Sequence, residues 1–202
     1  MSSHPMGATV PKVWRSPDHE YFLEPERKIK IPGFSEIVRD LGIVKDNPYW
    51  TDAGREEGTI LHAWLLFLAQ GKEPSIPPNP RIAGRVQGIR KFLEESKFKL
   101  SFGEEPQYDP VSCFACTPDL IGYIGALQVN IDAKRGDPQK WHVLQLTAQK
   151  IALASGMVHI EKSFGLYLRD GDYRLVEQDT RKHETKCRAI VSGFYAKKEY
   201  IK

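Results

Sequence analysis

TPDLIGYIGALQVNIDAK, residues 117–134, is the stretch of sequence that decides the fold. Between Leu127 and Asp132, apolar and polar side chains alternate, and this period of two predicts a β-strand. Gly125 indicates a tight turn, so the strand before it and the strand expected over residues 126–134 should be antiparallel neighbours. The sequence therefore predicts a sheet that contains this pair of strands.

Two carboxylates in this stretch predict a metal site. Asp119 follows Pro118 on the first strand, and Asp132 lies 13 positions later, so the turn decides whether the two lie side by side. Carboxylates at one end of a sheet suit Mg²⁺ or Mn²⁺, and the carbonyl oxygen of Ala133 can add a ligand. Lys134 faces the same way as Asp132, where an ammonium can position a water or stabilise charge on a phosphate. Two acids and a lysine on a solvated rim would give the same pattern, so these residues alone leave both interpretations open.

Helices are predicted on both sides of this strand pair along the chain. Before it, we expect a helix at residues 35–41, a helix that Thr51 or Asp52 caps and that ends near Gln70, a helix at 81–96, and strands at 98–108 and 111–124. After it, we expect a helix at 139–155 that Asp137-Pro138 begins, a hairpin of residues 159–168 and 173–177, and a basic amphipathic helix at 180–200. Residues 60–68 are apolar on nearly every face, which predicts a buried helix. This order predicts a mixed α/β domain with a small central sheet.

Length and composition are those of an ordinary globular domain. The chain has 202 residues, of which 41% are hydrophobic, so we expect a loose lead-in at residues 1–18 and a single domain at 19–202. The net charge of +3 permits an anionic partner such as nucleic acid but does not require one. No apolar run reaches the roughly 18–20 residues that span a bilayer, so we expect no membrane partner and a cytoplasmic protein. Three cysteines are too few for a four-cysteine metal site, and their odd number argues against a disulfide framework.

Four motifs in order resemble the RecB-like exonuclease branch of the PD-(D/E)XK nuclease superfamily, in its phage and bacterial form. Residues 58–62, GTILH, resemble its G-T-x-x-H helix motif, and residues 114–122, FACTPDLIG, resemble its A-G-T-P-D-L-I-G strand. Residues 129–136, VNIDAKRG, resemble its I-I-D-Y-K-T-G strand, and residues 145–149, QLTAQ, resemble its Q-L-x-x-Y helix. With upstream residues that look like the lead-in of many phage members, the resemblance covers residues 19 to about 155.

This resemblance implies a restriction-endonuclease-like fold, with a mixed β-sheet core of order αβββαβ flanked by helices. It also implies a role for each matching residue. Asp119 and Asp132 would bind the metal, with His62 as an additional ligand, and Lys134 would serve the nucleophilic water. Gln145 would hold the lysine or the DNA backbone. A Glu commonly begins the first strand in this branch, and Glu104, with Glu105 as the alternative, fits that place behind the ligands.

Three departures from the family pattern leave the metal ligands and the lysine intact. Cys116 replaces a Gly, Gln149 replaces a Tyr and so puts any role of that ring in doubt, and Arg135 stands where Thr or Ser is common. The cysteines that hold an iron–sulfur cluster in some relatives are not in the sequence, so we expect no such cluster. The expected cofactor is Mg²⁺ or Mn²⁺ alone.

The expected partner is DNA that is single-stranded or has free ends. Candidate phosphate contacts are Arg135, Arg85 on the predicted polar helix, and Lys182 and Lys186 on the basic C-terminal helix, where aromatic residues can stack on bases. The three helical residues, Arg85, Lys182 and Lys186, also fit a solvated helix face. The sequence thus favours an exonuclease that acts in replication, recombination or repair in a bacterial cell or a phage-infected host. An endonuclease of the same fold and a silent DNA-binding subunit are the alternatives, and the intact Asp-Asp-Lys set argues against the second.

Overall fold

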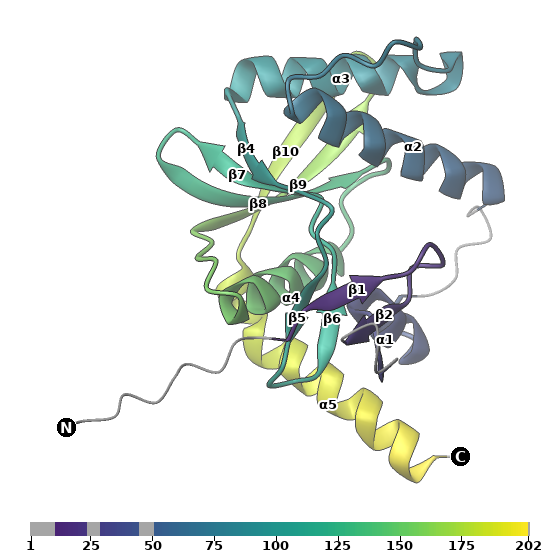
Figure 1. Ribbon diagram of the computed structural model, residues 1–202, viewed down its shortest axis with the longest axis vertical. Coiled ribbons are helices and arrows are strands. Elements are labelled where there is room, and N and C mark those ends of the chain that lie inside the picture. The colour runs from purple at the N-terminus through teal and green to yellow at the C-terminus, as the bar shows by residue number, and fades with distance from the viewer. Residues whose placement is uncertain (1–10, 24–28, 45–50, 202) are drawn as a thin grey trace.

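A mixed five-stranded sheet forms the centre of the protein in a computed structural model, which describes residues 11–23, 29–44 and 51–201 (Figure 1). The strand order is β10-β9-β8-β7-β4, and only the β8–β9 pair is parallel. The strands are β4 (Lys99–Phe102), β7 (Leu120–Ile124), β8 (Leu127–Lys134), β9 (Lys162–Arg169) and β10 (Asp172–Gln178). The antiparallel pairing of β7 with β8 through a turn at Gly125 confirms the prediction made from residues 117–134.

Helices cover both faces of this sheet. Figure 1 shows α2 (Asp52–Ala69) and α3 (Pro80–Ser96) on one side and α4 (His142–Ser155) on the other, with α5 (Glu184–Tyr200) beyond α4. Val129, Ile131 and Ala133 of β8 pack into the core beneath α2 and α3. Because side chains alternate along a strand, Asn130, Asp132 and Lys134 face α4 instead. The order α3, β4, β7, β8, α4, β9 confirms the expected αβββαβ core.

Smaller elements surround one end of the sheet. They are β1 (Val13–Arg15), β2 (Tyr21–Leu23) and β3 (Ile29–Ile31), which form a three-stranded sheet, α1 (Phe34–Asp40), and the pair β5 (Gln107–Asp109) and β6 (Phe114–Cys116). Part of the expected lead-in therefore belongs to a sheet, since β1 lies within residues 1–18. Residues 1–10 of that lead-in lie outside the described residues, and the boundary at residue 18 stays a prediction.

Two predicted strands are each divided in two, so the expectation of single strands at 98–108 and 111–124 was wrong. The first is divided between β4 and β5, where Glu104 adopts a left-handed backbone conformation with φ of 55°. The second is divided between β6 and β7 at Pro118, which has no N–H to give to a ladder. The Glu104 N–H donates to the Pro118 carbonyl at 2.9 Å, so the two breaks lie side by side.

Three helix predictions also need correction. α4 begins at His142 rather than at Asp137-Pro138, because residues 139–142 form a turn in which the His142 N–H donates to the Gln139 carbonyl. α2 is buried on one face only, with Ile60 37% and Phe67 45% exposed, because only one side of it meets α3 and the sheet. The C-terminal segment starts as a short 3₁₀ turn, η1 (Thr180–His183), before α5. Among the described residues, no helix has the length and apolar character needed to cross a membrane.

Two helical glycines allow the packing of α3 on the sheet to be tested. A Cβ added at Gly88 of α3 would lie 2.3 Å from the Asp172 carbonyl oxygen of the β9–β10 hairpin, whereas one added at Gly58 of α2 would meet nothing within 4 Å. We predict that Gly88→Ala lowers the free energy of unfolding by about 1–3 kcal/mol through overpacking. Gly58→Ala should instead raise it by up to about 1 kcal/mol, because alanine is the better helix former. Urea unfolding measures both changes. A stabilised Gly88→Ala variant would show that the β9–β10 hairpin can move away from α3 and accommodate the added methyl group.

Candidate metal centre and active site

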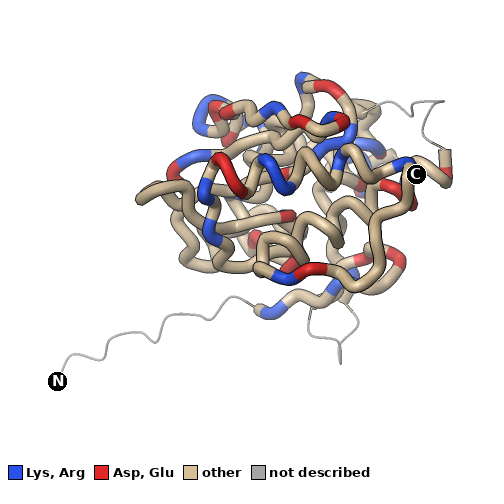
Figure 2. Tube along the Cα trace, turned by 90° about the horizontal axis from the view of Figure 1, so that it is seen from above, with Lys and Arg blue, Asp and Glu red and all other residues tan. Residues whose placement is uncertain are grey.

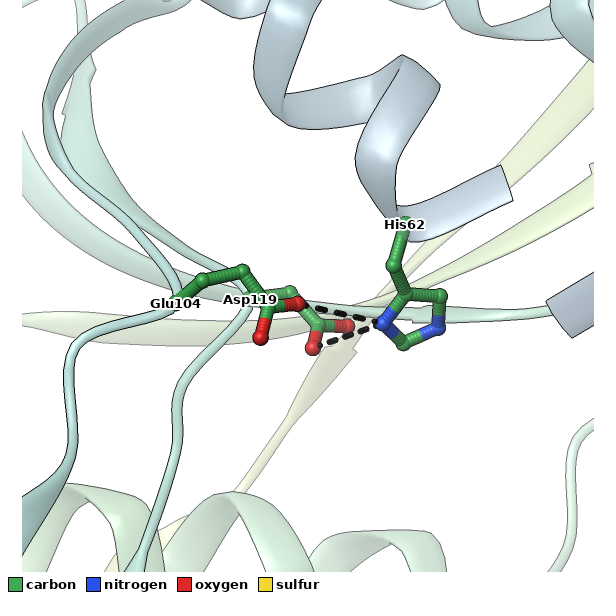
Figure 3. A group of neighbouring side chains, drawn as sticks. All are labelled: His62, Glu104 and Asp119. Atoms are coloured by element: carbon green, nitrogen blue, oxygen red, sulfur yellow. Dashed lines mark ion pairs between the residues drawn. The ribbon is translucent and has the colours of Figure 1, made fainter. Parts of the chain in front are cut away.

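Three side chains from three different elements meet at one point (Figure 3). His62 extends from α2, Glu104 from the break after β4, and Asp119 from the break before β7. The His62 Nδ1 atom lies 3.1 Å from the Asp119 Oδ1 atom and 3.5 Å from the Glu104 Oε1 atom. One donor atom of each residue lies within 4.8 Å of the others, so the three form a group that can hold a metal ion. Two carboxylates and an imidazole suit a divalent cation.

Neighbouring charges and burial raise the pKa values of His62 and Asp119 in this group. The Asp119 carboxylate beside His62 raises the pKa of the imidazole to about 10, with Glu104 adding a hydrogen bond. Burial raises the pKa of Asp119 in turn. When no cation is bound, His62 is therefore protonated at neutral pH, and its positive charge faces the Asp119 carboxyl group. A metal ion must displace that proton to use the ring nitrogen.

The register of β7 against β8 brings the two aspartates together. Leu120 pairs with Ile131, and one further step along both strands sets Asp119 opposite Asp132. The Ala133 N–H donates to the Asp119 Oδ2 atom at 2.6 Å, which ties the residue before β7 to the end of β8. The turn at Gly125 thus sets the register that the sequence left open.

Asp132 is surrounded by donors on both of its oxygens. It is 2% exposed, and its Oδ2 atom forms an ion pair with Lys134. Its Oδ1 atom accepts a hydrogen bond of 2.9 Å from the Nε2 atom of Gln145 and another of 2.9 Å from that of Gln149. Gln145 also accepts from the Lys134 Nζ atom at 2.9 Å, and this amine lies 5.8 Å from the centre of the Trp141 ring. Gln145 therefore contacts both halves of the Asp132–Lys134 pair.

The structure places the predicted metal ligands in two adjoining groups. His62 and Asp119 lie in the three-residue group, while Asp132 lies beside it in the group with Lys134. Glu104, expected behind the ligands, lies in the three-residue group with His62 and Asp119, and its role there stays a prediction. The alternative Glu105 is exposed. Direct metal binding by Asp132 and by the Ala133 carbonyl stays a prediction.

The four candidate DNA contacts do not gather on one surface. Arg135 lies near the site and pairs with Glu57 of α2, and Arg85 is half-buried on α3. Lys182 and Lys186 are exposed on η1 and α5, which lie on the opposite side of the sheet from α2 (Figure 1). Figure 2 shows Lys and Arg interspersed with Asp and Glu. DNA binding by these four residues stays a prediction.

A cavity of about 460 Å³ adjoins the site. The N-terminal sheet and α1 form one wall, and the metal group with the two glutamines forms the other. Basic side chains from the first wall are Arg15, Lys30 and Arg39. Arg15 also pairs with Glu104 at 3.3 Å, although the sequence placed it in a loose lead-in. The upstream family-like residues belong to this wall, but the sequence did not indicate that they border the site, because its strands are three residues long and cross-strand contacts bring them there.

Comparisons with known proteins give likenesses among solved structures. No protein-family model and no curated protein sequence matches the chain. Among solved structures, it is similar to the alkaline exonuclease LHK-Exo from Laribacter hongkongensis, at 14% identity and a TM-score of 0.47, over 83% of this chain and 87% of that one. The structure of LHK-Exo in complex with dAMP is similar at 15% identity and a TM-score of 0.37, over 85% and 91%.

The proton on His62 gives a testable property of the metal group. Because the pKa of His62 lies at about 10, we predict that Mn²⁺ binding at neutral pH releases about one proton. The apparent affinity should then rise by roughly tenfold per pH unit, up to the pKa of the ring. Calorimetry in buffers of different ionisation enthalpy measures the released proton. His62→Ala should remove the proton release, and a wild-type protein that releases none would exclude His62 as a ligand.

Proposed function

We propose that this protein is a Mg²⁺- or Mn²⁺-dependent DNA exonuclease of the PD-(D/E)XK superfamily. The observation that carries the proposal is the juxtaposition of the His62, Glu104 and Asp119 group with the Asp132–Lys134 pair at one end of the sheet. Carboxylates, an imidazole and an ammonium at one point are the groups that phosphodiester hydrolysis requires. The four family-like motifs supply residues to this point in the expected order.

His62, Glu104 and Asp119 would hold the cation, with Asp132 and the Ala133 carbonyl completing its ligands. The imidazole nitrogen should favour Mn²⁺ over Mg²⁺. A bound cation would supply Lewis-acid polarisation of the scissile phosphate and activation of the attacking water. The donor set fits this task, because hard oxygen ligands predominate and one nitrogen is present.

Lys134 would act on the reacting groups directly. Its ammonium is held by Asp132 and by the Gln145 carbonyl oxygen at 2.9 Å, so its position is fixed before substrate arrives. From there it would orient the attacking water and stabilise the charge that builds on a phosphate oxygen. Gln145 would position Lys134, which is one of the two roles that the family resemblance implies for it.

The cavity beside the site supports action at a DNA end. It has a volume of about 460 Å³, which suits a single nucleotide. Its N-terminal wall carries Arg15, Lys30 and Arg39, interspersed with the acids Asp18, Glu20 and Glu36. The proposed substrate is DNA that is single-stranded or has free ends, in replication, recombination or repair. An endonuclease of the same fold is the alternative, because a cavity that opened at both ends would admit a continuous strand.

A single assay separates these functions. Pure protein is incubated with end-labelled linear and with circular single-stranded DNA, in Mn²⁺ or in EDTA. An exonuclease releases nucleotides from the linear DNA alone, an endonuclease cuts both, and EDTA stops either. A protein that binds DNA and cuts neither substrate in Mn²⁺ or Mg²⁺ would be a silent subunit, and the proposal would fail.

Lys134 should serve chemistry rather than binding. We predict that Lys134→Ala lowers single-turnover cleavage by about 10²–10³-fold, as expected for one lost electrostatic donor. DNA affinity measured in Ca²⁺ should change little, because one phosphate contact among several is a small share of binding. Lys134→Arg should not restore the rate, since the planar guanidinium group of arginine cannot replace the compact ammonium group of lysine.

The exposed Lys140 provides the matched control, because Lys140→Ala removes a nearby ammonium outside the site. Its cleavage rate should equal that of the wild type. If Lys134→Ala instead weakened DNA binding strongly and cleaved normally when saturated, Lys134 would be a DNA clamp. Asp132→Ala should abolish cleavage, and full activity in that purified variant would contradict the proposed mechanism.

A further inference from the structure

A chain of buried polar groups runs beneath α4 and ends on Asp132. The Asn130 Nδ2 atom donates to the Gln149 Oε1 atom at 3.0 Å, and the Gln149 Nε2 atom donates to the Asp132 Oδ1 atom at 2.9 Å. Asn130, Gln149 and Asp132 are all less than 3% exposed. The hydrogen bonds of Gln149 do not follow from the family pattern, in which a tyrosine stands at this position.

The hydrogen bonds of this chain run in one direction. An amide has a donor end and an acceptor end, and Gln149 uses one on each neighbour. Because Asn130 donates to its oxygen, Gln149 must present its NH₂ group to Asp132. Asn130 and Asp132 lie two residues apart on the same face of β8, so one side chain from α4 can bridge them.

The two glutamines of α4 both bind Asp132 but differ in their second hydrogen-bond partner. Gln145 and Gln149 are four residues apart, and thus on the same face of the helix. Gln145 contacts both Lys134 and Asp132, whereas Gln149 contacts Asp132 and reaches back to Asn130. Two donors on the Oδ1 atom restrain the carboxylate from rotating, so its Oδ2 atom stays toward Lys134.

Asn130 also has a polar atom that no described protein group satisfies. Among the residues that the structure describes, the Asn130 Oδ1 atom and the Ser163 Oγ atom are buried without a hydrogen-bond partner. These two residues are neighbours across the β8–β9 pairing. A buried polar group left unpaired costs on the order of 1–3 kcal/mol, which an apolar residue at the same place would avoid. Such a cost is expected where a polar side chain serves a site rather than the core.

We propose that Gln149 is a positioning residue that fixes the Asp132 carboxylate, and that Asn130 fixes the orientation of the Gln149 amide. This inference rests on the proposed function, because Asp132 matters through the metal and the lysine. Partners that hold a metal ligand typically contribute about 10–100-fold to metal affinity or activity. Gln149 would act through Asp132 and not on the substrate itself.

The test compares four variants with the wild type: Gln149→Met, Asn130→Leu, their double variant, and Thr147→Val. Thr147→Val is the matched control, because Thr147 is buried on α4 and its hydroxyl bonds to the Val143 carbonyl and not to Asp132. Each variant is first checked for folding by circular dichroism. Single-turnover cleavage, KM for DNA and Mn²⁺ affinity by calorimetry are then measured.

We expect Gln149→Met to lower kcat and Mn²⁺ affinity by about 10–100-fold, with KM nearly unchanged. Asn130→Leu, which keeps Gln149, should lower both in the same direction, and the double variant should be no worse than Gln149→Met alone. Thr147→Val should match the wild type in all three measurements.

Two results would overturn the inference. One is a Gln149→Met variant with wild-type kcat and Mn²⁺ affinity. The other is a double variant whose loss is the product of the two single losses, since independent roles multiply. A wild-type protein that binds Mn²⁺ without cutting DNA would contradict only the proposed nuclease function. The comparison of Mn²⁺ affinities by calorimetry would still decide the role of Gln149.

Discussion

The antiparallel register of β7 and β8 is the constraint on which the site depends. Leu120 opposite Ile131 sets Asp119 opposite Asp132. The hydrogen bond from the Ala133 N–H to the Asp119 carboxylate holds Asp119 against the end of β8. A shift of one residue would turn Asp132 and Lys134 away from α4 and into the apolar core beneath α2 and α3. The burial of Val129, Ile131 and Ala133 on the opposite face of β8 therefore stabilises the site as well as the sheet.

Local pattern was enough to predict the strand pair and the order of the elements. The alternation from Leu127 to Asp132 and the turn at Gly125 are properties of neighbouring residues, and they predicted the antiparallel pairing of β7 with β8. The αβββαβ core was expected from the family resemblance. The division of the two preceding strands escaped prediction because it depends on a contact between residues 104 and 118, distant in sequence. The start of α4 escaped because a local turn at residues 139–142 prevails over the helix signal of Asp137-Pro138.

The site, like the fold, was predictable where it depends on local sequence pattern and unpredictable where it depends on contacts between residues distant in sequence. Asp119, Asp132 and Lys134 share one strand pair, so spacing indicated them, and the family-like motifs added His62 and Gln145. The place of Glu104 among the possible ligands depends on a left-handed residue after β4. Gln149 was recognised only as a departure from the family pattern. Its spacing from Gln145 places the two on one helix face, but its contact with Asp132 requires the packing of α4 on β8.

The two strand breaks enclose an excursion that links the central sheet to the elements around the cavity. Residues 105–117 leave the central sheet and return to it, and the hydrogen bond between Glu104 and Pro118 closes their base. Tyr108 and Ala115 within this excursion pack on the N-terminal sheet, which forms a wall of the cavity. Phe114 and Cys116 of the same excursion pack on α4, the helix that carries Gln145 and Gln149. An excursion of different length would therefore reshape the cavity and shift the helix that positions Asp132 at the same time, so this insertion couples the shape of the substrate cavity to the chemistry beside it.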